Sequence, residues 1–504
     1  MTGKTLMVQG TGSSVGKSVL VTALCRIFKQ RGLKVAPFKA QNMSLNSFAT
    51  VDGGEIGRAQ AVQAEASGIP ASIDMNPVLL KPEADNCSQI IVGGKPLTRV
   101  SAADFPQLKS FLWTAISKSL DRLRERFDVV IIEGAGSPAE INLRDRDLVN
   151  MEVALYCDSP VLLAADIDRG GVFASLIGTM QLLEESEKEH IKAFIINKFR
   201  GDISLLKPGL DWLENRTGVP VAGVIPYYHD IYIPEEDSMP VEKRRAMKQK
   251  RAVDIDVAVI ALPHIANFDD FDPLEREAGV GLRYVEAGND LGDPDLIILP
   301  GAKTTISDLA YLKENGRDRE ILRQVAGGTP IIGICGGYQM LGLAIHDVDG
   351  IESAVPTITG LSLLPVTSRF LTMKATRQIS ARVLVDRGLF AKAKDFTVRG
   401  YEIHMGITTG SSMLNPFEVT QRGSQPCADL EGCMSPDGNV LGTYIHGLFH
   451  NDDFRWALLR NLAEKKGKDF SPVIGSFSID EQYDRLAAHV RDSIDMGLIQ
   501  RLIA

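Results

Sequence analysis

The sequence is poor in cysteine, in net positive charge and in long hydrophobic runs. Its 6 cysteines among 504 residues form no CxxC pair, which argues against a disulfide framework or a zinc site. No apolar run reaches the roughly 18 residues of a membrane helix, and the N-terminal apolar run is too short for a signal peptide. A net charge of -9 disfavours nucleic acid as a partner, because phosphate binding needs a basic face. We therefore expect a cytoplasmic protein that binds neither nucleic acid nor membrane.

Internal repeats are also absent, and short apolar runs alternate instead with amphipathic stretches. The runs lie at 34–38, 127–136, 160–167 and 192–199, and then at 254–263, 294–301, 329–335 and 439–447. Such alternation favours parallel sheets covered by helices. The predicted fold class is α/β, with two tandem three-layer domains and mostly parallel sheets. The predicted division is a first domain over 1–235, a linker over 236–253, a second domain over 254–450 and a helical C-terminal segment over 451–504. The basic run at 243–251 is typical of a solvated linker.

The stretch "GTGSSVGKS" (10–18) lies between the first predicted strand and the first predicted helix. Its glycines let backbone N–H groups close around phosphate oxygens, and the helix N-terminus adds a positive dipole end. Lys17 would reach the outer phosphates, and the Ser18 hydroxyl would bind magnesium. The glycine spacing differs from that of the standard loop, and a glycine-rich turn without a ligand is the alternative. We expect ATP and Mg2+ here, bound by Gly10, Thr11, Gly12, Ser14, Gly16, Lys17 and Ser18.

Further candidates for this site follow two predicted strands. Glu133 ends the run "FDVVIIE", where an acidic residue at the carboxyl edge of a parallel sheet can hold magnesium. Asp52 is a weaker candidate for the same metal. Lys39, Asp145 and Asp147 are candidates for contact with substrate or a phosphoryl group. A surface or helix-capping role is the alternative for each of them.

The stretch "TPIIGICGGYQMLG" (329–342) indicates a buried strand that runs directly into a helix around Cys335. A sharp strand-to-helix turn exposes its central side chain, and flanking glycines relieve the crowding. The helix N-terminus favours the thiolate, which is the nucleophilic form. The N–H group of Gly336 would then face the oxyanion, with a second donor from the loop "LPGAKTT", at Gly301. A small buried core residue is the alternative for Cys335.

A thiol nucleophile usually works with a base, and three histidines of the second half are candidates. His446 in "GTYIHGLFH" ends a predicted strand of the same domain as Cys335. His404 in "RGYEIHMG" and His450 are its competitors. We favour His446 as the catalytic partner of Cys335.

These motifs together resemble a known family. "GICGGYQMLG" with the later "TYIHG" resembles the class I glutamine amidotransferase domain, and "GTGSSVGKS", "EGAGSP" and "NKFRGD" resemble the dethiobiotin-synthetase-like ATP domain. Their order, with "FKAQNMSLNS", "MNPVLLKP", "DIDRGGVFAS" and "GYEIHMG", resembles the cobyric acid synthase family of cobalamin biosynthesis over nearly the whole chain.

The resemblance implies that glutamine is hydrolysed at Cys335 and that the ammonia is consumed at the ATP domain. The b, d, e and g side-chain carboxylates of adenosylcobyrinic acid a,c-diamide would become amides through acyl phosphates. Glutamine and a corrinoid would thus be the substrates, with no permanently bound cofactor. Two positions depart from related patterns. Leu448 stands where class I amidotransferases usually carry a triad glutamate, which leaves open what orients His446, and Gly12 stands where partitioning ATPases carry a signature lysine.

Three alternatives remain at this stage. Cobyrinic acid a,c-diamide synthase shares both domains and the same chemistry. A partitioning-type nucleotide-switch ATPase would carry the signature lysine and a basic amphipathic terminal helix, but the tail of this chain is not notably basic. A pathway scaffold with an inert cysteine would lack glutaminase activity.

Overall fold

The computed structural model describes residues 2–84, 87–101, 104–228, 230–234, 254–410, 414–472 and 477–504. The chain divides into two compact units. Unit 1 consists of Met1–Ser44, Ile56–Pro234 and Phe477–Ala504, and unit 2 of Leu45–Glu55 and Glu235–Ser476. The predicted linker at 236–253, with its basic run at 243–251, lies outside the described residues.

The units differ from the predicted division in two places. The short segment Leu45–Glu55 lies within the predicted first domain but folds with unit 2. Conversely, the predicted C-terminal segment at 451–504 is divided, because Phe477–Ala504 folds with unit 1. Neither unit is therefore a continuous piece of the chain.

Unit 1 is built on a six-stranded sheet in which all paired strands are parallel. Its order is β12 (Val221–Pro226), β11 (Ile191–Phe199), β10 (Val161–Asp166), β1 (Lys4–Gly10), β9 (Val129–Glu133) and β2 (Val35–Phe38). The four apolar runs of the first series form β2, β9, β10 and β11, as predicted. Because β1 and β9 are parallel neighbours, the phosphate loop and Glu133 leave the same edge of the sheet.

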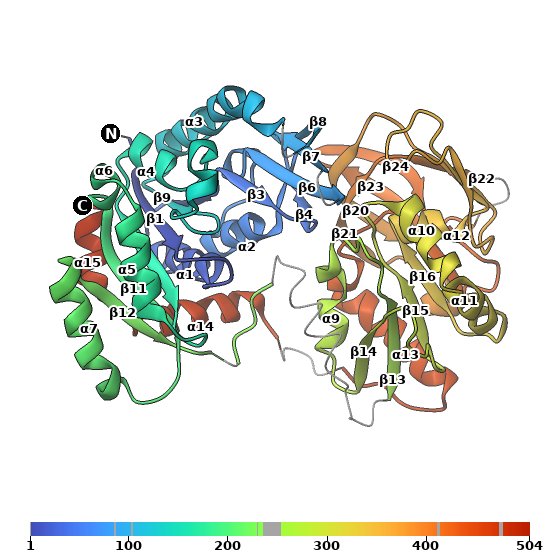
Figure 1. The fold of residues 1–504 in the computed structure, drawn as a ribbon. Helices are drawn as coiled ribbons and strands as arrows, with labels where there is room; N and C mark the ends of the chain where they lie inside the picture. The colour runs from blue at the N-terminus through green and yellow to red at the C-terminus, as the bar shows by residue number, and fades with distance from the viewer. Residues whose placement is uncertain are drawn as a thin grey trace. The chain divides into compact units, whose positions relative to one another are not determined.

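In unit 1, a helix from the C-terminal part of the chain packs on a helix from the N-terminal part. The helices are α1 (Lys17–Gln30), α2 (Arg58–Ser67), α3 (Lys109–Arg126), α4 (Met151–Cys157), α5 (Val172–Leu182), α6 (Glu185–Lys188), α7 (Ile203–Thr217), α14 (Ile479–Arg491) and α15 (Met496–Leu502). Helix α14 runs along α1 (Figure 1) and buries Tyr483 and Leu486 in the cluster that contains Leu24 and Phe28 of α1. This apolar face explains why the last residues belong to unit 1.

A smaller sheet in unit 1 was not predicted from the sequence. Its order is β3 (Gln41–Met43), β6 (Val78–Ala84), β7 (Cys87–Val92) and β8 (Lys95–Ser101), with short 3-10 helices at Ile73–Met75, Phe105–Leu108 and Ile141–Arg146. The strands β6, β7 and β8 pair antiparallel. Strands β4 (Ser47–Ala49) and β5 (Glu55–Gly57) form a separate two-stranded sheet.

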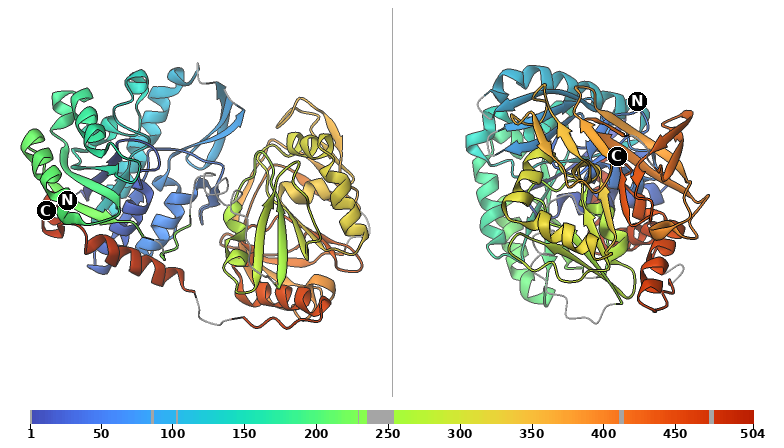
Figure 2. Two further views of the ribbon diagram at one scale, coloured as in Figure 1. Left: turned by 60° about the horizontal axis from the view of Figure 1, so that its bottom comes forward. Right: turned by 90° about the vertical axis from the view of Figure 1, so that its right-hand side faces the viewer.

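Unit 2 has a second six-stranded sheet, parallel except at one edge. Its order is β14 (Val280–Val285), β13 (Ile255–Ile260), β15 (Leu296–Leu299), β16 (Ile331–Ile334), β26 (Val440–Thr443) and β25 (Cys433–Met434), and only β25 is antiparallel to its neighbour. The helices are α9 (Asp272–Glu275), α10 (Thr305–Glu314), α11 (Arg317–Ala326), α12 (Gly336–Leu341) and α13 (Asp452–Lys465). Figure 2 shows α10 and α11, in yellow, beside the green strands of this sheet. The predicted α/β class with mostly parallel sheets is confirmed.

Two four-stranded sheets complete unit 2. One has the order β18 (Thr357–Thr359), β17 (Ala344–His346), β19 (Val366–Arg369) and β22 (Ile407–Gly410), and the other β21 (Thr397–His404), β20 (Ala375–Val383), β23 (Phe417–Arg422) and β24 (Gln425–Glu431). Short 3-10 helices lie at Phe268–Phe271, Gly388–Phe390 and Leu448–His450. Among the described residues, no helix is both long and apolar enough to cross a membrane.

Candidate active sites

The phosphate loop of unit 1 joins β1 to α1 and contains two residues with positive φ angles. Ser14 and Gly16 have positive φ angles of 60° and 101°. A Cβ atom on Gly16 would lie 2.3 Å from Nδ2 of Asn197, which itself donates to the carbonyl of Val15 at 2.8 Å. Only glycine therefore fits this position without moving Asn197. The loop conformation is thus held by β11, a strand remote in sequence.

Lys17 is the first residue of α1, and its side chain contacts two loops. Its Nζ atom donates to the carbonyl oxygens of Gly12 at 2.8 Å and Gly136 at 2.9 Å. Gly136 belongs to the loop that follows β9, so the ammonium group lies between the phosphate loop and the "EGAGSP" loop. A phosphate oxygen can replace these carbonyls as the acceptor, because a lysine ammonium is a mobile point charge.

Glu133 is the centre of a buried polar cluster beside the loop. Its side chain is 1% exposed; Oε1 accepts from Ser18 Oγ at 2.8 Å and Lys39 Nζ at 2.9 Å, and Oε2 accepts from Gln63 Nε2 at 2.5 Å. Burial would raise the pKa of Glu133, but the Lys39 ammonium and these hydrogen bonds outweigh it, so the pKa lies below its ordinary value. The carboxylate is therefore charged at neutral pH.

The oxygen atoms in this cluster are the type of ligand that Mg2+ prefers. Ser18 Oγ and Glu133 Oε1 already lie 2.8 Å apart at the carboxyl edge of the sheet. The donor set therefore fits a magnesium ion that accompanies a nucleotide. Bound there, the ion would neutralise charge on the phosphate oxygens, while Lys39 would turn from Glu133 to an anion.

The other acidic candidates are placed differently. Asp52 is exposed in a turn of the segment Leu45–Glu55, which folds with unit 2, and accepts from Thr50 Oγ1. Asp145 is exposed on the 3-10 helix before α4. The roles of Asp52 and Asp145 stay predictions.

Asp147 caps the first turn of α4. Its Oδ1 accepts from the N–H groups of Val149 and Asn150, both at 2.9 Å, and its Oδ2 accepts from those of Met151 at 2.8 Å and Glu152 at 3.3 Å. These bonds satisfy N–H groups that a helix start leaves without partners. Asp147 therefore has a structural task, and its contact with substrate stays a prediction.

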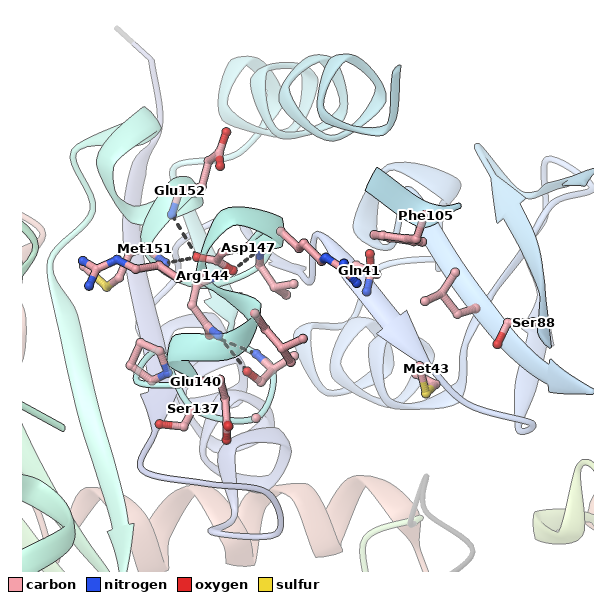
Figure 3. A pocket seen from close by; sticks show the side chains of 18 of the residues that line it. Gln41, Met43, Ser88, Phe105, Ser137, Glu140, Arg144, Asp147, Met151 and Glu152 are labelled. Atoms are coloured by element: carbon pink, nitrogen blue, oxygen red, sulfur yellow. Dashed lines mark hydrogen bonds between the residues drawn. The ribbon is translucent and has the colours of Figure 1, made fainter. Parts of the chain in front are cut away.

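A cavity of about 740 Å³ opens beside the phosphate-loop site within unit 1. Gly136, which accepts from Lys17, forms part of its wall. Figure 3 shows Gln41, Met43, Ser88 and Phe105 on one side of it and the residues of the loop after β9 and of α4 on the other. The wall combines apolar side chains with amide, hydroxyl and guanidinium groups, which suits a large ligand that carries polar substituents.

In unit 2, Cys335 occupies the turn between β16 and α12 as predicted. Its φ angle is +53° and its ψ angle is -107°, a strained conformation for a residue that is not glycine. A Cβ atom on Gly337 would lie 2.0 Å from the carbonyl oxygen of Leu299, and one on Gly336 would lie 3.0 Å from the amide nitrogen of Ala302. The two glycines thus let the nucleophile turn approach the loop after β15. The strain holds the thiol at the end of the strand.

His446 is the histidine that the structure brings to Cys335. Its imidazole is 2% exposed, and the Cys335 sulfur is near enough to contribute to the pKa of the ring. A Cβ atom on Gly301 would lie 3.1 Å from Cε1 of His446, so the predicted oxyanion loop borders the same ring. Cys335, His446, Gly301 and Gly336 therefore form one cluster, although their catalytic roles stay predictions.

Asp270 completes this cluster and was not predicted. Its Oδ2 lies 2.7 Å from Nδ1 of His446, and its Oδ1 accepts from the N–H group of Gly447 at 2.7 Å. Burial favours the neutral imidazole, but the Asp270 carboxylate and the Cys335 sulfur act in the opposite direction and raise the pKa of His446 to about 10. Asp270 thus provides the carboxylate partner of His446 that Leu448, without a polar group, cannot provide.

The competing histidines have other surroundings. His404 stacks on Tyr444 with 3.8 Å between ring centroids, and its Nδ1 lies 2.9 Å from the carbonyl oxygen of Gly406. Burial lowers the pKa of His404 to about 4, so its ring is neutral at pH 7. His450 is exposed at the end of a 3-10 helix.

A second cavity, of about 330 Å³, lies next to this cluster. Its wall includes His404 and Tyr444. Ile403, the residue before His404, has its carbonyl oxygen 3.4 Å from the Sγ atom of Cys335. The wall also holds Glu402 and Arg422, which are paired with 3.1 Å between Oε2 and Nε. Groups of both charges therefore lie where an amino acid with its ammonium and carboxylate could bind.

The chain matches known families over both units. A family model described as CobQ/CobB/MinD/ParA nucleotide binding domain matches residues 6–241, and one described as CobB/CobQ-like glutamine amidotransferase domain matches residues 256–454. A protein of Sorangium cellulosum (strain So ce56) named cobyric acid synthase is 51% identical over 517 residues, covering 100% of this chain and 99% of that protein.

Another relative and one solved structure give the range of the similarity. The cobyric acid synthase of Desulforamulus reducens is 48% identical over 505 residues, covering 99% of this chain and 98% of that protein. The structure of PurLQS from Thermotoga maritima covers 42% of this chain and 99% of its own, with 19% identity and a TM-score of 0.32, too low to support an argument.

Proposed function

The chain belongs to the cobyric acid synthase family, and we propose that it amidates the b, d, e and g side-chain carboxylates of adenosylcobyrinic acid a,c-diamide. It is an ATP-dependent amide-forming ligase with a glutamine amidotransferase domain. The observation that carries the detailed proposal is the cluster of Cys335, His446 and Asp270, in which Asp270 is bonded to the imidazole, in a chain that also holds the Lys17 and Glu133 site.

In unit 2 we assign glutamine to the smaller cavity. The Cys335 sulfur attacks the side-chain amide carbon of glutamine, and the oxyanion faces the loops at Gly301 and Gly336. His446 gives a proton to the departing ammonia, which leaves a glutamyl thioester. Water, with its proton taken by His446, then hydrolyses the thioester to glutamate. Asp270 keeps the imidazole in one orientation through both steps.

In unit 1 we assign the corrinoid to the larger cavity, with a carboxylate directed toward the phosphate loop. A carboxylate is a poor electrophile, so its oxygen must first become a leaving group. Transfer of the γ-phosphoryl group of ATP gives an acyl phosphate and ADP, with Lys17 and Lys39 as the cations that face the transferred group. Ammonia then attacks the carbonyl carbon, and phosphate leaves as the amide forms.

The structure offers no support for the partitioning-type switch. Such a protein uses an amphipathic terminal helix on a membrane surface. In this chain the apolar side of α14, with Tyr483, Leu486 and Val490, is buried in the core of unit 1.

The decisive experiment compares wild type with Cys335→Ala for amide formation on cobyrinic acid a,c-diamide with ATP, using glutamine or ammonium as the nitrogen source. We expect the variant to fail with glutamine and to work with ammonium at raised pH, where more of the nitrogen is free ammonia. Normal use of glutamine by the variant would refute the role of Cys335. Failure of wild type with ammonium on this corrinoid would refute the proposed acceptor.

A further inference from the structure

The segment Leu45–Glu55 interrupts the ATP-binding half of the sequence but folds with the glutaminase unit. It follows β3, whose Gln41 and Met43 line the larger cavity, and it precedes α2, whose Gln63 donates to Glu133. The chain therefore leaves the acceptor and nucleotide site, enters unit 2, and returns. Nothing in the proposed chemistry of unit 2 explains why a piece of the other half should belong there.

Several buried polar contacts hold the segment in unit 2. Glu55 is fully buried, pairs with the ammonium of Lys374 and accepts from Ser47 Oγ at 2.7 Å. The side-chain amide of Gln378 donates to the carbonyl oxygen of Ala49. A buried carboxylate without its cation would be strongly destabilising, so the Lys374 pair specifies where the segment binds.

From this position the segment reaches His446 by two routes. Through the first, the Phe48 ring lies 5.3 Å from that of Tyr401, which stacks on the imidazole of His446 at 5.3 Å with 16° between the ring planes. Tyr401 and His446 also exchange backbone hydrogen bonds of 3.1 and 2.9 Å. Phe48 therefore packs on Tyr401, and Tyr401 covers one face of the His446 imidazole.

Through the second route, the segment bonds to the turn that carries Asp270. The Ser47 N–H group donates to Oδ1 of Asn267 at 3.3 Å, and Oδ1 of Asn46 accepts from the N–H group of Phe268 at 3.2 Å. Asn267 also donates from Nδ2 to the Tyr401 hydroxyl at 3.3 Å, so the two routes are joined. Asn267 has a φ angle of +53°, a conformation that its bonds to the segment help to hold.

We propose that Leu45–Glu55 is a positioning element of the glutaminase centre, in which Phe48 and the two polar residues before it hold Tyr401 and the Asp270 turn against His446. This inference rests on the proposed glutaminase function. Its consequence is that the geometry of His446 depends on a segment whose two ends continue into the acceptor and nucleotide site. Phe48 touches neither substrate nor Cys335 in this role, so it acts on catalysis only through Tyr401 and His446.

The test uses the full chain with Phe48→Ala, Phe48→Tyr and the control Val51→Ala, an exposed residue of the same segment. Glutamine hydrolysis is measured as kcat and KM, and ammonium-dependent amidation is measured on the same samples. The rate of Cys335 alkylation by iodoacetamide between pH 5 and 9, located by mass spectrometry, reports the reactivity of the sulfur beside His446.

An aromatic pair contributes about 0.5–1.5 kcal/mol, which corresponds to a change of about 2- to 12-fold in rate. We expect Phe48→Ala to lower the kcat of glutamine hydrolysis by about tenfold with little change in KM, and to shift the alkylation profile toward higher pH. Phe48→Tyr and Val51→Ala should keep the wild-type kcat and alkylation profile. All three variants should keep the wild-type rate of ammonium-dependent amidation.

Two results would overturn the inference alone. One is a kcat of glutamine hydrolysis and an alkylation profile in Phe48→Ala that equal those of the wild type. The other is an equal loss of the glutamine-dependent and ammonium-dependent reactions in Phe48→Ala, which would indicate general misfolding. If the wild-type chain itself does not hydrolyse glutamine, the proposed function is refuted and this inference with it.

Discussion

Replacing Asp270 with asparagine tests what orients His446. The aspartate accepts two hydrogen bonds of 2.7 Å, one from the imidazole Nδ1–H and one from the backbone N–H of Gly447. An asparagine has only one acceptor atom at this end, so its NH2 group must face one of these two donors. If it faces the ring, Nδ1 becomes an acceptor and Nε2 carries the proton, so a neutral ring replaces the imidazolium that Asp270 stabilises.

The expected magnitude follows from the size of acid–base contributions. The same substitution in a serine protease triad lowers kcat about 10⁴-fold, and a thiol depends less on its base than a hydroxyl because it is more acidic and more nucleophilic. We therefore expect Asp270→Asn to lower the kcat of glutamine hydrolysis by about 10²- to 10³-fold, or about 3–4 kcal/mol. The pKa of His446, about 10 in the wild type, should fall because burial is then opposed by less negative charge.

The assay is glutamine hydrolysis over pH 6–10 beside ammonium-dependent amidation at raised pH. The alkaline limb of the hydrolysis profile should move to lower pH, and the ammonium reaction should be retained because it uses unit 1. Asp256→Asn is the matched control, since Asp256 pairs with Arg283 at 2.9 Å in the same unit without a role at Cys335. Hydrolysis within threefold of wild type in Asp270→Asn would refute the reasoning.

Further predictions concern the nucleotide site, the C-terminal helix and stability against pH. Lys17→Ala should abolish amidation with either nitrogen source and leave basal glutamine hydrolysis measurable, as followed by glutamate release. Gly16→Ala should lose ATP-dependent amidation as well, because φ is +101° and the new Cβ would lie 2.3 Å from Asn197 Nδ2; ATP binding by calorimetry checks this. Leu486→Ala, at a fully buried position, should destabilise unit 1 by about 2–5 kcal/mol in denaturant unfolding. Because the pKa of His446 is raised in the folded state to about 10 from about 6.5 unfolded, its stabilising contribution is full below about pH 6.5 and is lost as pH rises through 10. The difference in Tm between wild type and Asp270→Asn should shrink across that window.

The residues that the sequence identified best are those whose function depends on local backbone geometry. The strand–turn–helix pattern around Cys335 and the loop at Lys17 each combine glycines with one reactive side chain over a few residues, so the pattern itself carries the chemistry. The inner strands of both main sheets were also predicted, because they are continuous buried runs, whereas the edge strands β12, β14 and β25 lie outside the predicted runs.

Residues that act through remote partners were not identified. Asp270 is 176 positions from His446, and it follows another aspartate, so no local spacing distinguishes it as the partner of a histidine. Gln63 and Asn197 likewise reach the nucleotide site from other elements, as neutral amides without a motif of their own.

The two exchanged segments give a physical reason for keeping both activities in one chain. A fragment that ended at Pro234 would leave the apolar face of α1 without Tyr483 and Leu486 of α14. A fragment that began after Pro234 would lack Phe48 beside Tyr401, and Lys374 would lose its buried partner Glu55. Each unit therefore depends on residues that the rest of its sequence does not supply. A protein split at the linker would lose part of the core of one unit and part of the packing around His446 in the other. Fusion therefore maintains the structure of both centres.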